Sequence, residues 1–353
     1  MKILITGGAG FVGSYLAKSF RAHNPKAKIV ALDNLKRRGS ENNLSAFKKL
    51  DIEFVHGDVR NKSDFDGLGG NFDVLIEASA EPSVHAGVSG SPGYLLDTNL
   101  LGTLHCLEFA RKHVDRTIFL STSRVYSIAA LKNIELSFGD TRVSLSEKGM
   151  QPGLSTKGIS EDFDVSKARS LYGATKLASE MMCQEYAFTY GTKILINRCG
   201  VIAGPGQFGK VDQGVFTMWV ANHVYNKPLK YLGFGGLGKQ VRDLLHPFDL
   251  FNLISKQLDS NQFAECPIFN AGGGNASSTS LLELTEICRR VTGNSVEISS
   301  TPETAAVDVP YYISDNSKVE RAFSWQPEKS VNNIIVDIFN WINENKIFLK
   351  DIF

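Results

Sequence analysis

The amino-acid sequence predicts an α/β protein built on a doubly wound parallel sheet, followed by a smaller mixed α/β C-terminal domain. Short apolar runs with strand character alternate with helical patterns along the first part of the chain, which is the order that a parallel sheet with crossover helices requires. A glycine-rich turn joins the first strand to the first helix, and an acidic residue ends the second strand. In such a sheet these turns lie at the carboxyl ends of the strands, where ligands bind.

The predicted elements divide the chain into two domains. Residues 1–198, with 240–272 returning to them, are expected to form the first domain, and 199–239 with 273–353 the second, which binds the substrate. Ser280, with Glu283 three residues later, is the expected N-cap of a helix that starts at Leu281. Strands are predicted at 2–5, 28–32, 53–55, 73–76, 117–120, 193–196 and 268–272, and helices at 14–20, 94–112, 171–188, 248–258, 281–291 and 331–343.

Composition places the chain among ordinary globular proteins. It has 353 residues, 42% of them hydrophobic and 21% charged, with a net charge of +1, so nothing points to nucleic acid or an anionic membrane as a partner. Five scattered cysteines without metal-ligand spacing argue against a disulfide framework or a metal site. No apolar run reaches the roughly 20 residues of a membrane span. The first residues read as a strand rather than a signal peptide, so we expect a cytoplasmic protein.

The glycine-rich turn predicts a dinucleotide site. Gly7, Gly10 and Gly13 form a G-x-x-G-x-x-G pattern between the first strand and the first helix. Such glycines let the backbone approach a pyrophosphate closely, while the helix N-terminus supplies N–H groups and a positive dipole. The spacing differs by one residue from the G-x-G-x-x-G fingerprint, and similar turns also occur without a ligand. With this turn, residues 1–198 are interpreted as the dinucleotide-binding domain.

The acidic residue at the end of the second strand favours NAD. The carboxylate of Asp33 is placed to accept hydrogen bonds from the adenosine ribose and would repel a 2′-phosphate. The basic run 36–38 could instead hold the 2′-phosphate of NADP, or it could simply form a solvated loop. The residues predicted to line the cofactor are Gly7, Gly10, Phe11, Val12, Gly13, Asp33, Asn34, Lys36, Asp58, Val59, Ala78, Ser79, Ala80, Asn99, Tyr172 and Lys176.

A tyrosine and a lysine near the middle of the chain predict acid–base chemistry. Tyr172 and Lys176 are four residues apart in a segment with helical periodicity, so they share one face of a helix. An ammonium at about 4 Å favours the phenolate by roughly 4 kcal/mol and would bring the pKa of the phenol from ~10 toward ~7. Proton transfer is efficient near that value. Any amphipathic helix can carry this pair, so the interpretation depends on its context.

That context resembles a known family. The glycine turn, Asp33, the sequence Ser121-Thr122-Ser123 and the Tyr172/Lys176 pair occur in the order found in the extended short-chain dehydrogenase/reductase family of nucleotide-sugar epimerases and dehydratases. The resemblance covers nearly the whole chain and implies a Rossmann fold with bound NAD. It also implies that Tyr172 is the catalytic acid–base, that Lys176 holds the nicotinamide ribose and lowers the pKa of Tyr172, and that Thr122 binds the reacting sugar oxygen.

The resemblance also indicates which reaction of the family this chain catalyses. Dehydratases of this family carry Asp-Glu after the hydroxyl residue, where this chain has Ser123-Arg124, so dehydration lacks its acid and base. The loop 33–44, the long insertion 127–171 and the segment 238–246 are similar to the CDP-tyvelose (CDP-paratose) 2-epimerases. This implies epimerisation by transient oxidation to a keto sugar and re-reduction. A UDP-hexose 4-epimerase reaction and a non-catalytic NAD-binding protein are the alternatives, and a homodimer is expected.

Substrate contacts are predicted by position in the same family. The candidates are Ser123, Arg124, Gln213, Tyr231 and Arg242. Arg242 is suited to a diphosphate because a guanidinium matches its geometry; the alternative is that Arg242 forms a surface ion pair. Tyr231 either stacks on or beside the nucleotide base of the substrate, or only packs within the protein. Relatives often supply a second arginine from the segment that corresponds to 301–315, whose stretch 301–308 has no basic residue here. Either another cation, Arg124 or Lys210, replaces it, or the substrate differs.

Overall fold

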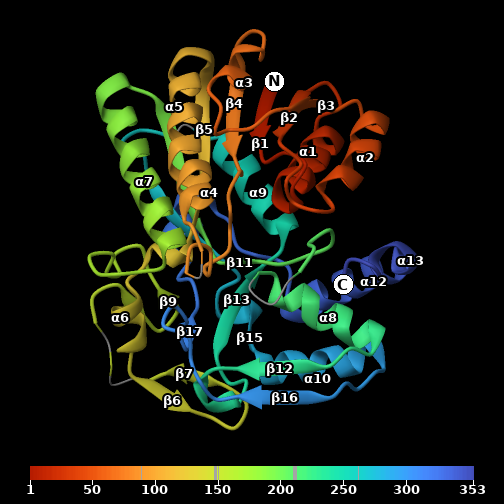
Figure 1. Ribbon diagram of the computed structural model, residues 1–353. Helices are drawn as coiled ribbons and strands as arrows, with labels where there is room; N and C mark the ends of the chain where they lie inside the picture. Colours follow the sequence, from red (N-terminus) through yellow and green to blue (C-terminus); the bar gives the residue numbers. More distant parts are fainter. Residues whose placement is uncertain (89, 147–148, 150, 210–212, 261) are drawn as a thin grey trace. The chain divides into compact units, whose positions relative to one another are not determined.

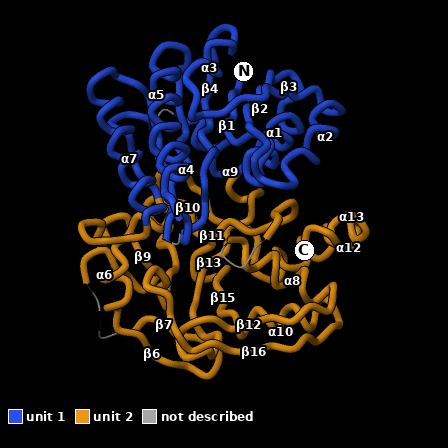
Figure 2. Tube along the Cα trace, viewed as in Figure 1, with its two compact units in different colours: residues 1–122, 171–198, 251–269 blue, residues 123–170, 199–250, 270–353 orange. Residues whose placement is uncertain are grey.

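The computed structural model describes residues 1–353 except 89, 147–148, 150, 210–212 and 261. The chain forms two compact units, which we describe separately (Figure 2). Unit 1 consists of residues 1–122, 171–198 and 251–269, and unit 2 of residues 123–170, 199–250 and 270–353.

A seven-stranded sheet forms the centre of unit 1. Its order is β14-β10-β5-β4-β1-β2-β3, and the strands from β5 to β3 pair in parallel (Figure 1). The bounds are β1 Lys2–Thr6, β2 Lys28–Asp33, β3 Glu53–His56, β4 Phe72–Glu77, β5 Val114–Thr122, β10 Lys193–Cys199 and β14 Ile268–Ala271, whose last two residues belong to unit 2. The predicted doubly wound parallel sheet is therefore confirmed.

Helices cover both faces of this sheet, which explains the nearly continuous apolar runs of its strands. In α1 (Phe11–His23), Leu16 and Phe20 are buried, and the ring of Phe20 meets that of Phe251 edge-on with centroids 5.0 Å apart. Burying a side chain of this size stabilises the fold by about 1.5–3 kcal/mol. The helices of unit 1 are α1 Phe11–His23, α2 Asn43–Lys49, α3 Ser63–Asp66, α4 Gly93–Leu96, α5 Gly102–His113, α7 Leu171–Tyr190 and most of α9 Pro247–Leu258.

Parallel pairing brings the carboxyl ends of the strands to one edge. Thr6 ends β1, Asp33 ends β2, Glu77 ends β4 and Thr122 ends β5. The register pairs Thr6 with Leu32 on one side and with Glu77 on the other. This edge holds the predicted dinucleotide turn, as expected for ligand sites in doubly wound sheets.

Unit 2 packs two amphipathic helices and one largely apolar helix around an apolar cluster that includes Trp219, Leu284 and Ile338. Serine capping boxes start two of the helices: Ser280, as predicted, accepts a hydrogen bond from the Glu283 N–H, and Ser330 starts α12 in the same way. The principal elements are α8 Val215–Tyr225, α10 Leu281–Thr292, α12 Val331–Glu344 and a sheet of β11 Val201–Ile202, β13 Val241–Leu245, β15 Ser278–Ser280 and β17 Tyr311–Tyr312, with β12 Leu229–Leu232 pairing β16 Ile298–Thr301.

Residues 123–170 belong to unit 2, whereas the sequence reading placed them in the first domain. Backbone bonds explain the difference: Ile159 donates to Ile313, and Val143 donates to Lys239. Val143 also packs in one cluster with residues of β13 and β17. The segment returning to unit 1 is accordingly 251–269, shorter than the predicted 240–272. The inserted elements are α6 Ile128–Lys132, β6 Leu136–Phe138, β7 Val143–Leu145, β8 Leu154–Ser155 and β9 Gly158–Ile159.

The remaining elements are short. They are α11 Ser317–Phe323, α13 Lys346–Leu349, η1 Ser40–Asn42, η2 Asp97–Leu101, η3 Ser123–Val125, η4 Phe234–Gly236 and η5 Asn275–Ser277. Within the described ranges, no helix combines the length and the apolar character that crossing a bilayer would require.

Candidate functional site

The glycine turn in unit 1 is closed so tightly that side chains are excluded from it. A Cβ on Gly13 would lie 2.2 Å from the carbonyl oxygen of Gly7, and one on Gly7 would lie 2.8 Å from the carbonyl oxygen of Ala78. Gly7 also has a φ of 63°, which favours glycine. The α1 helix begins at Phe11 with Gly10 as its N-cap, so its first N–H groups lie beside this bare backbone. This cradle fits a pyrophosphate.

Asp33 is fixed beside the turn by backbone donors. The Ala9 N–H donates to Oδ2 at 3.1 Å, and the Leu35 N–H donates to Oδ1 at 2.7 Å. Burial raises the pKa of Asp33, while the N–H groups of Leu35, Ala9 and Gly10 oppose this rise. The carboxylate is thus held at the end of β2, next to the cradle, in the position that a ribose-binding acid requires.

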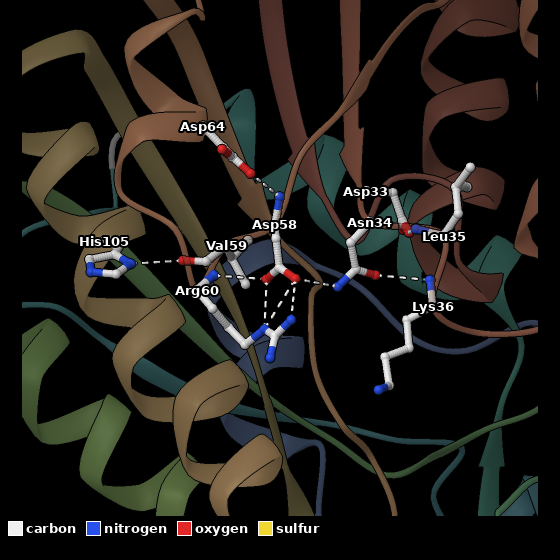
Figure 3. Close-up of polar contacts among 9 residues, drawn as sticks. All are labelled: Asp33, Asn34, Leu35, Lys36, Asp58, Val59, Arg60, Asp64 and His105. Atoms are coloured by element: carbon white, nitrogen blue, oxygen red, sulfur yellow. Dashed lines mark hydrogen bonds and ion pairs between the residues drawn. The ribbon is translucent and has the colours of Figure 1, made fainter.

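Asp58 is the centre of a second polar group, drawn in Figure 3. Asn34 Nδ2 donates to Asp58 Oδ2 at 2.9 Å, and Arg60 Nη2 donates to the same oxygen at 2.7 Å. Burial alone would raise the pKa of Asp58, but the hydrogen bonds from Arg60 and Asn34 lower it to about 2. The predicted residues Asp58 and Asn34 are thus brought together, and sequence reasoning missed Arg60, which lies in the loop after β3.

The ring of Tyr94 contacts two cations, Lys36 and Arg60. Lys36 Nζ lies 4.1 Å from the centroid of its ring, and Arg60 Cζ lies 4.7 Å from it, both within cation–π range. A 2′-phosphate was the alternative anticipated for the basic run 36–38. The Lys36 ammonium instead lies over an aromatic ring, which supports the preference for NAD.

Asn99 lies in a π-helical segment, η2, between α4 and α5. Its side chain accepts a hydrogen bond from the Glu81 N–H at 2.8 Å and donates to the Thr175 hydroxyl at 3.2 Å. The predicted helix 94–112 is therefore present, with one wide turn that the sequence did not indicate. Asn99 joins the loop after β4 to α7, and its contact with a cofactor remains a prediction.

The three predicted catalytic residues all belong to unit 1. Thr122 ends β5, and Tyr172 and Lys176 lie one turn apart at the start of α7. All three are largely buried, with 9%, 9% and 2% of their surfaces exposed. Lys176 Nζ lies 3.9 Å from the ring centroid of Phe119 on β5, so α7 and β5 place the pair above the sheet. Their roles remain predictions.

The α7 helix is fastened to its neighbours by buried polar contacts. Glu180 accepts hydrogen bonds from Arg198 on β10, at 2.8 Å to Nη2, and from the hydroxyl of Ser121. Ser179 donates to the Asn99 carbonyl at 2.8 Å. A catalytic pair on this helix would therefore have a fixed position relative to β5 and η2.

Two arginines of unit 2 converge on one short segment. Arg242 Nη2 donates to the Val309 carbonyl at 2.6 Å, and Arg124 Nη1 approaches the Val307 carbonyl at 3.4 Å. Burial and the neighbouring charge of Arg124 lower the pKa of Arg242 to about 9. Two partly buried guanidinium groups that repel each other form a site suited to an anion. Of the two replacements considered for the missing arginine, Arg124 lies beside Arg242, whereas Lys210 lies outside the described residues.

The other predicted substrate residues also lie in unit 2. Tyr231 stacks on Trp219 with centroids 5.8 Å apart, and its hydroxyl pairs with Thr285 at 2.8 Å, which favours the packing alternative. The side-chain oxygen of Gln213 is buried and makes no hydrogen bond to the described residues. Ser123 begins η3. Their contacts with a substrate remain predictions.

Comparisons with known proteins agree with this geometry. The profile of the NAD dependent epimerase/dehydratase family matches residues 3–272. The chain is 30% identical to a CDP-paratose 2-epimerase of Salmonella typhi over 97% of this chain and 99% of that protein. It is 28% identical to a putative UDP-glucose 4-epimerase of Methanocaldococcus jannaschii over 97% and 99%. A Bacillus cereus UDP-glucuronic acid 4-epimerase, solved with UDP-glucuronic acid and NAD, has the same fold, with a TM-score of 0.79 at 23% identity over 98% of this chain and 99% of that one.

Proposed function

The chain belongs to the NAD dependent epimerase/dehydratase family, and we propose that it epimerises a CDP-linked deoxyhexose at C2, interconverting CDP-paratose and CDP-tyvelose. NAD is its cofactor, and a nucleotide sugar is its class of substrate. The 30% identity to a CDP-paratose 2-epimerase over nearly the full length of both chains supports the choice of sugar nucleotide.

The arrangement of Thr122, Tyr172 and Lys176 carries the proposal. It supplies one acid–base and its cation, while Ser123 and Arg124 stand where a dehydratase needs two carboxylates. Such a site can oxidise and reduce a carbinol, but positions 123 and 124 do not carry the acid and base that eliminate water in a dehydratase. Epimerisation is therefore the reaction that these residues support best.

Bound NAD supplies reversible hydride transfer. In the proposed reaction Tyr172, as phenolate, takes the proton of the sugar hydroxyl while the carbon is oxidised to a ketone, and Thr122 holds the reacting oxygen. The ketone then presents its other face, and Tyr172 returns the proton when the carbon is reduced. No net oxidation occurs, so the cofactor stays bound between turnovers. The Lys176 ammonium favours the phenolate throughout.

Arg124 and Arg242 are proposed to bind the substrate diphosphate. Both are partly buried, and both reach carbonyl groups of the segment 307–309. An anion between them would relieve their repulsion, and a guanidinium matches the geometry of phosphate oxygens.

A UDP-hexose 4-epimerase reaction is the second candidate, favoured by the 28% identity to a putative UDP-glucose 4-epimerase. It would use the same groups with the sugar turned differently. Incubating the purified protein with CDP-paratose, CDP-tyvelose, UDP-glucose and UDP-galactose in parallel, followed by NMR, separates the two. Conversion of CDP sugars alone supports the proposal, whereas conversion of UDP sugars alone would replace it.

We further propose a homodimer formed through α4, η2 and α7 of unit 1. Large apolar side chains are exposed on these elements, among them Leu96, Leu101, Met181 and Phe188. Met181 and Phe188 are seven residues apart and therefore share a face of α7. Light scattering should give twice the chain mass of 38.7 kDa; a monomer mass would contradict the proposal.

A further inference from the structure

Glu77 is a buried acidic residue at the carboxyl edge of the unit 1 sheet, next to α5. It is the last residue of β4, is 1% exposed, and lies beside Phe119 in the β4–β5 register. The Thr103 hydroxyl on α5 donates to Oε1 at 2.6 Å. The other oxygen, Oε2, is buried and accepts no hydrogen bond from the described residues. Nothing in the sequence distinguished this residue from an ordinary strand end.

A buried carboxylate that keeps its charge needs a counter-charge nearby. The titratable groups that face Glu77 among the described residues are Cys106 on α5 and Lys176 and Cys183 on α7. Burial raises the pKa of both thiols, so they are neutral and offer no charge. Lys176 is thus the cation that faces the carboxyl group.

Lys176, as a buried ammonium, likewise needs a counter-charge nearby. It is 2% exposed, and its Nζ lies over the ring of Phe119, which is the residue paired with Glu77 across the strands. Burial of an ammonium favours loss of its proton, whereas a carboxylate within reach favours retention. The aromatic ring adds a smaller attraction for the charged form.

We propose that Glu77 is the counter-ion that keeps Lys176 protonated inside the protein, and that it is therefore a positioning residue for the Tyr172–Lys176 pair. The proposal rests on the proposed function for the catalytic importance of that pair. Glu77 acts on the charge of Lys176 and through it on the phenol. Burial raises the pKa of Glu77, and the Lys176 charge is the main influence against that rise.

The test compares the parent protein with Glu77→Gln, which keeps the shape and a hydrogen-bonding group for Thr103 but removes the charge. In NAD-saturated protein labelled with [13Cε]lysine, the Lys176 resonance is assigned by its absence from Lys176→Arg. We expect its titration midpoint to fall by about one pH unit or more in Glu77→Gln, a tenfold loss of proton affinity. Glu77→Asp, which retains a charge, should restore most of the shift. An unchanged midpoint in Glu77→Gln would overturn the proposal.

Cys106→Ala is the matched control, because it alters packing beside Glu77 without altering charge. Its Lys176 midpoint should equal that of the parent protein, and a shift as large as in Glu77→Gln would attribute the effect to packing and overturn the proposal. The alkaline limb of the kcat/KM profile should also move to lower pH in Glu77→Gln only.

A second measurement remains if Glu77→Gln does not fold. In Lys176→Met, Glu77 has a raised pKa and no counter-ion, so stability relative to the parent should fall as the pH rises from 5.5 to 8. Parallel stability curves would overturn the proposal. Failure of the parent protein to convert any nucleotide sugar would refute the proposed function, while the lysine titration would still decide the role of Glu77.

Discussion

Arg198 on β10 binds both carboxylate oxygens of Glu180 on α7, with Nε at 3.1 Å from each and Nη2 at 2.8 Å from Oε2. Only 6% and 1% of the two side chains are exposed. Glu180 lies one turn beyond Lys176 on α7. The pair therefore fixes the helix that carries the proposed acid–base without taking part in the chemistry.

Breaking this pair should destabilise the protein strongly. Glu180→Gln leaves the Arg198 charge buried without its counter-charge, which typically costs about 3–5 kcal/mol of unfolding free energy. Urea unfolding measures the change. The control is Glu108→Gln, which removes the partner of Arg111 in a partly exposed pair on α5 and should cost less than about 1 kcal/mol. Equal losses in the two variants would show that burial does not decide the strength of the pair.

The glycine cradle should not accept a side chain. In Gly13→Ala, the new Cβ would lie 2.2 Å from the Gly7 carbonyl oxygen, so the turn must open. A backbone shift of this kind costs roughly 1–3 kcal/mol. We therefore expect the affinity for NAD to fall by about tenfold or more. Calorimetric titration with NAD measures this. Gly67→Ala is the control, because a Cβ there meets no atom of the described residues within 4 Å. Unaltered NAD affinity in Gly13→Ala would place the pyrophosphate elsewhere.

Asp33 should decide between NAD and NADP. Asp33→Asn removes the charge that accepts ribose hydroxyls and repels a 2′-phosphate, so we expect NAD to bind about tenfold more weakly, since a hydrogen bond to a charged group contributes roughly 1.5–3 kcal/mol. NADP should bind more tightly than it does to the parent protein. Dissociation constants for both cofactors provide the check. Asn34→Ala, which keeps the carboxylate, should leave the preference for NAD intact; a parent protein that prefers NADP would contradict this account.

Removing either proposed diphosphate ligand should weaken binding of the nucleotide. Arg242→Met and Arg124→Met each lose a charge-assisted contact, so the dissociation constant for CDP should rise by roughly 10- to 100-fold. Lys230→Met, at an exposed position on β12 of the same unit, is the control and should bind CDP like the parent. Because the charge of Arg124 lowers the pKa of Arg242, Arg124→Met should also raise the pKa of Arg242. Full CDP affinity in both arginine variants would show that the diphosphate binds elsewhere.

The parts of the structure that follow from local sequence were predictable. The glycine turn, the strand ending in Asp33 and the four-residue spacing of Tyr172 and Lys176 each depend on neighbours in the chain, and the structure contains all of them. The fold class follows because alternating strands and helices permit few other arrangements.

The features that depend on contacts between residues far apart in the sequence were not predictable. The wide turn around Asn99 shows no periodicity of its own, and the contribution of Glu77 depends on Thr103 and Lys176, which are far from it in sequence. The insertion 127–171 was longer than expected for a simple epimerase, but its place in unit 2 depends on backbone pairing with residues 239 and 313. No single-chain pattern specifies such pairings.

The most direct test of the central claim is turnover by Tyr172→Phe, which removes one phenolic oxygen from the proposed acid–base. With the nucleotide sugar that the parent protein converts, we expect kcat to fall by about 10²- to 10⁴-fold, while NAD affinity and the unfolding free energy stay close to those of the parent. Turnover at the parental rate, with NAD bound and the fold intact, would contradict the account, because no proton donor or acceptor would remain at that position.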